Sequence, residues 1–291
     1  MNRLLPALAA AIAGILVGTG IVATRFVIGQ SDPASLALWR YGIGALCLLV
    51  PFLLMTRAVI ARRDLLPICL LGIVQFAVLI VLHNYSLRHI PAALGSVIFA
   101  SLPLLTLVIG AGLGREPITL PKAAGVGLTI LGVALALGDR LAVPAGGGLL
   151  WLGALAMLAS AFCGALCSVL YRPYLQRYPS LQVSFLAMVA SVVFLCLPAG
   201  AAGFFTQLPR FTEGGWLAVV FLGVSSGGGY YLWLWALNHT TPTRVTIFLA
   251  LSPVTATALG AWLLGERVSG LFLLGLAAVA LGLVLAHLDR R

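Results

Sequence analysis

The sequence predicts an all-helical polytopic membrane protein with ten transmembrane helices, arranged as two inverted five-helix repeats with both termini in the cytoplasm. Three observations support this prediction. The chain of 291 residues is 62% hydrophobic and only 8% charged. Apolar runs of roughly 20 residues, the length that crosses a bilayer, recur along the whole chain. The second half repeats the first at an offset of 150 residues.

The apolar runs are read as helices because barrel strands are about ten residues long and alternate polar with apolar side chains. The first run lacks a convincing cleavage site for a signal peptide and is kept as a span. We expect spans at residues 5–24, 34–56, 66–82, 92–113 and 120–137 in the first half, and at 149–170, 181–201, 216–237, 245–264 and 271–288 in the second.

The net charge of +10 does not indicate nucleic-acid binding, because the basic residues lie at span ends and form no cluster. With the N-terminus inside, eleven Lys and Arg residues fall on the cytoplasmic side and six on the other. The positive-inside rule therefore favours both termini in the cytoplasm. The expected location is a bacterial inner membrane.

The five cysteines all fall within spans, which argues against a disulfide framework. Cys163 and Cys167 could share a helix face, but neither a His nor a carboxylate lies near them to complete a metal site. The sequence therefore predicts neither a metal nor a cofactor.

The repeat is carried by six non-aliphatic matches. His89, Pro103, Gly110, Glu116, Gly125 and Gly132 recur as His239, Pro253, Gly260, Glu266, Gly275 and Gly282. We place the first repeat at residues 1–143 and the second at 144–291. Because each holds an odd number of spans, the second must enter the membrane with the opposite orientation. Such inverted repeats carry their site near the midplane, between the halves.

A proline followed thirteen residues later by a glutamate, and then by a glycine-spaced helix, resembles the paired EamA-type domains of the drug/metabolite transporter superfamily. The resemblance covers essentially the whole chain. It implies ten helices, with spans one to four and six to nine around a cavity and spans five and ten at the periphery. It says far less about the substrate, because one fold can host many functions.

Arg40 is the first candidate for substrate binding. It lies about 10 Å into the second span at 1.5 Å per residue. It either faces a cavity, where its guanidinium would suit a carboxylate, or snorkels to the headgroups. Arg25, at the end of the first span, is expected to be an interfacial anchor.

Polar side chains in the third and eighth spans provide further candidates. Gln75 either bonds a neighbouring helix or lines a cavity, and His83 is either a solvated interfacial residue or a functional one. Ser226, Tyr230 and Trp233 share one helix face that suits a pocket, although aromatic residues near a span end also form interfacial belts.

Five residues are expected to shape or move helices. The run of Gly227, Gly228 and Gly229 permits either close packing or a local break in the eighth span. Pro103 and Pro253 occupy equivalent interiors of the fourth and ninth spans, where a proline kinks a helix. The paired kinks are either structural or act as hinges.

All seven acidic residues lie at span ends or in loops. Without a buried carboxylate, a pocket selective for cations is difficult to build. We therefore expect a transporter, not an enzyme, that exports zwitterionic or neutral metabolites by alternating access through a cavity between the repeats. Amino acids are the favoured class, with aromatic ones a subset suggested by Tyr230 and Trp233.

Two rival functions are a multidrug or cationic-compound exporter, and a membrane-embedded enzyme or scramblase. An enzyme would need titratable groups gathered at one membrane face, whereas the four His residues are scattered. The expected partners are a small-molecule substrate and the lipid bilayer, with the protein a monomer or weak homodimer.

Overall fold

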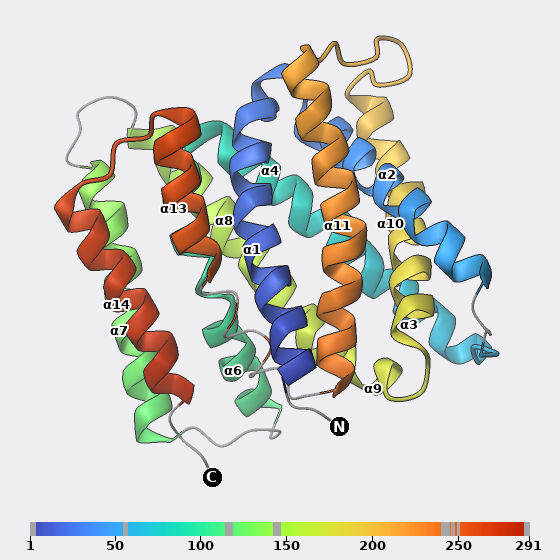
Figure 1. Cartoon of the computed structure of the whole chain (residues 1–291), viewed down its shortest axis with the longest axis horizontal. Coiled ribbons are helices and arrows are strands. Elements are labelled where there is room, and N and C mark those ends of the chain that lie inside the picture. The colour runs from blue at the N-terminus through green and yellow to red at the C-terminus, as the bar shows by residue number, and fades with distance from the viewer. Residues whose placement is uncertain are drawn as a thin grey trace.

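A computed structural model of the chain describes residues 4–54, 58–113, 119–141, 147–239, 245, 248 and 251–287. The regular secondary structure of these residues is helical and includes no strand, which confirms the expected all-helical class (Figure 1). The elements are α1 (Leu4–Val27), η1 (Ile28–Gln30), α2 (Pro33–Leu54), α3 (Arg62–Gly72), η2 (Ile73–Val78), α4 (Leu79–His89), α5 (Ala92–Phe99), α6 (Leu102–Gly112), α7 (Leu120–Leu141), α8 (Gly147–Leu170), α9 (Arg172–Leu175), α10 (Ser180–Ala201), α11 (Glu213–His239), α13 (Leu251–Leu264) and α14 (Gly270–His287).

Seven of the described helical stretches are long and apolar enough to cross a bilayer. Three shorter apolar helices, Leu120–Ala136, Leu251–Leu264 and Gly270–Gly282, fall at the expected fifth, ninth and tenth spans. Large apolar side chains cover the outside: Leu54, Leu217 and Trp262 are 82%, 74% and 79% exposed. Lipid tails are the natural solvent for such a surface, so the protein is polytopic in the membrane.

Two of the expected spans are built from more than one helix. The third runs through α3, η2 and α4, and η2 is a π-helix. In the fourth, α5 ends at Phe99 and α6 begins at Leu102, which places Pro103 in the first turn of α6. The expected kink inside a helix is therefore wrong for Pro103, because a first-turn proline needs no hydrogen-bond partner for its nitrogen. Pro253 is buried within α13.

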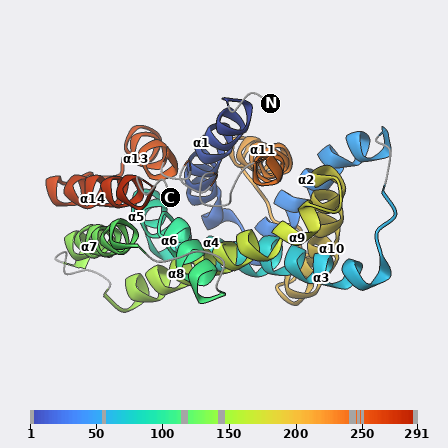
Figure 2. The ribbon, with the colours of Figure 1, turned by 90° about the horizontal axis from the view of Figure 1, so that it is seen from below.

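The repeated glycines pack α7 against α14. A Cβ added at Gly132 would lie 2.6 Å from the Gly275 carbonyl oxygen, and one at Gly282 would lie 2.6 Å from the Gly125 carbonyl oxygen. Only glycine permits this approach of two backbones. The two helices lie side by side at one end of the molecule in both views (Figures 1 and 2).

Glu266 joins the two halves at one face of the protein. Its carboxylate accepts hydrogen bonds from the backbone N–H groups of Ala92 at 2.7 Å and Ala93 at 3.0 Å, in the first turn of α5. The chain folds back to reach them, and the Glu266 N–H donates to the Gly260 carbonyl at 3.1 Å. A Cβ at Gly260 would come within 2.9 Å of the carboxylate. Gly260 and Glu266, both repeated residues, thus act together to cap the N-terminus of α5.

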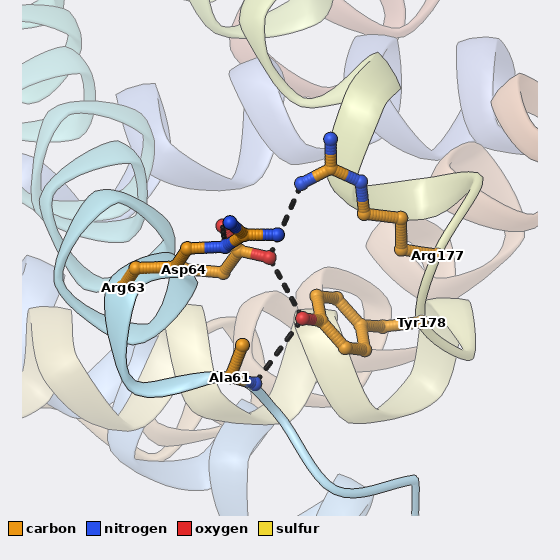
Figure 3. Close-up of polar contacts among 5 residues, drawn as sticks. All are labelled: Ala61, Arg63, Asp64, Arg177 and Tyr178. Atoms are coloured by element: carbon orange, nitrogen blue, oxygen red, sulfur yellow. Dashed lines mark hydrogen bonds and ion pairs between the residues drawn. The ribbon is translucent and has the colours of Figure 1, made fainter.

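A second contact between the halves lies at the face where α1 begins, which we call the N-face (Figure 1). Asp64 opens α3 and accepts a hydrogen bond from the Tyr178 hydroxyl at 2.7 Å and one from Arg177 at 3.3 Å (Figure 3). The Tyr178 oxygen in turn accepts the Ala61 N–H at 3.2 Å. Nearby, the Gln182 amide exchanges two hydrogen bonds with the Ala58 backbone.

We expect Glu266→Ala to lower the free energy of unfolding by about 1–2 kcal/mol, because it removes a helix cap and leaves two N–H groups unpaired. The measurement is thermal unfolding in detergent. Glu213→Ala is the matched control, since Glu213 is exposed and lies at a helix start. Equal losses in the two variants would contradict the capping role.

Tyr178→Phe should lower the free energy of unfolding by about 1–3 kcal/mol, because the Asp64 carboxylate and the Ala61 N–H both lose their hydroxyl partner. Tyr174→Phe is the control, because Tyr174 is partly buried against the core and no hydrogen bond to its hydroxyl is seen among the described residues. Wild-type stability of Tyr178→Phe would show that this contact is dispensable.

Candidate functional site

A cavity of about 120 Å³ lies among the central helices of the protein. Helices from both halves contribute to it, including α1, α2 and α4 from the first and α8 and α11 from the second. Its walls are formed by Ala13, Leu16, Val17, Ile21, Arg40, Tyr41, Gln75, Phe76, Leu79, Ile80, His83, Phe99, Leu102, Gly164, Ser168, Ser225, Ser226, Gly229, Tyr230 and Trp233. Aromatic and aliphatic walls with a few convergent polar groups are typical of a small-molecule site.

A larger hollow of about 510 Å³ lies between α2 and α10. Its lining is almost wholly apolar and includes side chains that are themselves exposed, such as Leu46 and Val193. Lipid tails suit a surface of this kind. The central cavity is therefore the candidate site.

Arg40 is the cationic side chain of the cavity. Its Nε donates a hydrogen bond to the Ser226 hydroxyl at 2.6 Å, which ties α2 to α11 across the two halves. Its Cζ lies 5.6 Å from the centre of the Tyr41 ring. Among the described residues no carboxylate pairs with Arg40. The guanidinium is thus oriented through Nε and keeps its terminal N–H groups for another acceptor.

The six residues selected from the sequence for substrate binding all line this one cavity: Arg40, Gln75, His83, Ser226, Tyr230 and Trp233. The expectation that His83 is solvated at the interface is wrong, because it is only 4% exposed. Its ring lies 5.4 Å from that of Phe99, and both ring nitrogens lack a partner within the described chain. Buried nitrogens without partners are costly unless a ligand or water completes them.

Aromatic side chains form a continuous column along the cavity. The Tyr41 and Phe76 rings lie 4.8 Å apart, and Phe76 and Tyr230 lie 4.3 Å apart, both edge to face. Tyr171 backs Tyr230 at 6.5 Å. Sequence reasoning identified only Tyr230 of this column. Tyr41 directly follows Arg40 and could have been noticed, whereas nothing in the sequence marks Phe76.

The glycine run pairs helices and does not break one. The helix α11 continues from Glu213 to His239 without interruption, so the alternative of a local break at Gly227, Gly228 and Gly229 is wrong. A Cβ at Gly227 would lie 2.8 Å from the Gly44 carbonyl oxygen of α2. Close packing of α11 on α2 brings Ser226 to Arg40.

Arg25 anchors α1 against the end of α4. Its guanidinium donates hydrogen bonds to the carbonyls of Leu87 at 2.8 Å and Arg88 at 3.4 Å. Arg88 reaches across to the Ser31 carbonyl, and Asn84 donates to the Pro33 carbonyl at 2.9 Å. These bonds close the bundle at the face opposite the N-face.

The helical membrane fold, with a largely apolar cavity that carries a few polar groups and is shared by both halves, is the architecture of an integral membrane transporter. The chain belongs to the EamA-like transporter family, whose model matches residues 4–138 and again residues 151–288. The resemblance inferred from the repeated Pro, Glu and Gly residues is thereby confirmed. The family match also confirms the prediction of a transporter in preference to an enzyme.

Curated relatives point the same way. The "Probable terminal-alkyne amino-acid exporter" of Streptantibioticus cattleyicolor is 31% identical over 228 residues, covering 77% of this chain and 74% of that protein. The "Probable amino-acid metabolite efflux pump" of Escherichia coli K12 is 27% identical, covering 72% and 71%. The E. coli "Uncharacterized inner membrane transporter YedA" is 26% identical, covering 99% and 93%.

A solved crystal structure has the same fold. It superposes with a TM-score of 0.74 over 99% of this chain and 98% of its own, at 23% sequence identity. At this level of identity the likeness concerns the fold alone.

Proposed function

We propose that this protein exports small zwitterionic metabolites, above all amino acids, across a bacterial inner membrane by alternating access. The observation that carries the proposal is Arg40, a cation in the central cavity with no carboxylate partner among the described residues. Arg40 is half-buried, and a charge that is partly withdrawn from water is less favourable without a partner of opposite charge. A substrate carboxylate would pair it, and the planar guanidinium can bind such a group with two parallel hydrogen bonds.

The remaining lining suits the rest of a zwitterion. The faces of Tyr230 and Trp233 can attract an ammonium group through cation–π contacts. The Gln75 amide and the unpartnered nitrogens of His83 offer further hydrogen bonds. The described lining includes no carboxylate, which disfavours the rival reading of a cation exporter. The names of two relatives, an amino-acid exporter and an amino-acid metabolite efflux pump, agree with this substrate class.

The mechanism that we propose uses the two repeats, residues 1–143 and 144–291, as halves of inverted orientation with ten spans in all and both termini in the cytoplasm. The excess of basic residues on the expected cytoplasmic side supports this orientation. The Glu266 contact on one face and the Asp64 contact on the N-face both join the halves. Each would break in turn as the cavity opens to one side.

We expect Arg40→Ala to reduce amino-acid counterflow in proteoliposomes at least about 30-fold, because loss of a desolvated charge pair costs about 2–5 kcal/mol. Arg40→Lys should recover part of the flux, since it keeps the charge and loses the planar fork. Arg172→Ala is the control, because Arg172 is exposed and lies outside the cavity.

The same counterflow assay tests the function itself. Radiolabelled alanine, leucine, phenylalanine and a lipophilic cation are compared side by side, with and without a protonophore. Exchange of the amino acids supports the proposal. Flux of the lipophilic cation alone, abolished by the protonophore, would establish the multidrug reading, and unchanged flux in Arg40→Ala would remove Arg40 from the site.

A further inference from the structure

We propose that the π-helix η2 makes the cavity a small chamber, and that Phe76 is a specificity-determining residue that restricts transport to amino acids with short side chains. The inference rests on the proposed function and names the subset of substrates. It differs from the expectation, drawn from Tyr230 and Trp233, that aromatic amino acids are transported.

The π-helix presents two consecutive residues to the cavity. The Leu79 N–H at its end donates to the Val74 carbonyl, five residues earlier. Gln75 and Phe76, both within η2, line the cavity. Insertions of this kind occur frequently at functional sites. Here η2 contributes one polar and one large apolar side chain to the cavity wall.

Phe76 has no room to withdraw. It is 1% exposed and held edge to face between Tyr41 and Tyr230. The backbone behind it is also held, because a Cβ added at Gly72, directly before η2, would overlap the Ala187 backbone of α10. The ring therefore forms a fixed wall of the cavity.

The space beside Phe76 is small for an aromatic substrate, although the cavity is partly open. The cavity measures about 120 Å³, whereas an engineered apolar cavity of about 150 Å³ is what encloses a single benzene ring. A carboxylate bound at Arg40 and its α-carbon occupy part of the volume, which leaves room for a side chain of a few atoms. Tyr230 and Trp233 then act as walls and contacts for the ammonium group, and do not stack on a substrate ring.

The test is counterflow of alanine, serine, valine, leucine, phenylalanine and tryptophan in proteoliposomes. We expect the wild-type protein to exchange alanine and serine at least tenfold faster than phenylalanine. Phe76→Ala should shift this ratio at least tenfold towards leucine and phenylalanine, and Phe76→Leu, which retains most of the apolar volume, should shift it less. Phe185→Ala is the matched control, because Phe185 stacks on Phe52 in the surface hollow, away from the cavity.

Two results would overturn the inference. One is wild-type exchange of phenylalanine as fast as that of alanine. The other is a Phe76→Leu variant that elutes as a monodisperse protein and still exchanges the six amino acids in the same ratios as the wild-type protein. This variant is included because it keeps most of the apolar volume, so that folding does not depend on the larger truncation to alanine. Either result leaves amino-acid transport in place. Absence of any amino-acid exchange by the wild-type protein would instead contradict the proposed function, and this inference with it.

Discussion

The cost of placing charge inside a bilayer governs the arrangement of this protein. Ionised side chains inside the apolar interior must find partners or face a cavity, and none of the described residues that line the cavity is acidic. Two acidic residues, Glu266 and Asp64, accept hydrogen bonds from the other half of the chain through their carboxylates. Arg40 is the exception, since it lies within the bundle and is steadied by a neutral hydroxyl. Among the described residues that line the cavity, Arg40 is the one cation, and none of them is a carboxylate.

Much of the fold and the identity of several cavity residues could be predicted from the sequence, because span length, hydropathy and helical phase are local properties. The phase of the eighth span separated Ser226, Tyr230 and Trp233 from the other aromatic residues, and all three line the cavity. The depth of Arg40 likewise followed from counting residues. A polar residue in an apolar helix is energetically favourable at few places, namely in a cavity, beside a polar partner or near the headgroups. This restriction is why the sequence could identify these cavity residues.

What the sequence did not reveal depends on contacts between distant segments. The burial of His83 arises from packing against Phe99, a residue sixteen positions along the chain. The π-helix leaves no pattern in residue type, so Phe76 remained hidden. The break before Pro103 and the continuity of α11 through three glycines show the same limit. A proline or glycine limits or widens the conformations that a backbone can adopt, and the contacts with neighbouring helices determine which of them is formed.

The glycine contacts between α7 and α14 have a consequence for how such a chain could arise. Gly132 of α7 contacts Gly275 of α14, and Gly125 of α7 contacts Gly282 of α14. Because Gly125 is equivalent to Gly275 and Gly132 to Gly282 in the repeat, the two contacts are related by a two-fold axis. A surface that matches itself in this way is the signature of a two-fold dimer. A single repeat therefore already contains both surfaces of this helix–helix contact. An ancestor of half this length would assemble as a dimer of two antiparallel copies, which a gene duplication then joined in one chain. The recognition between the halves then resides in the helices.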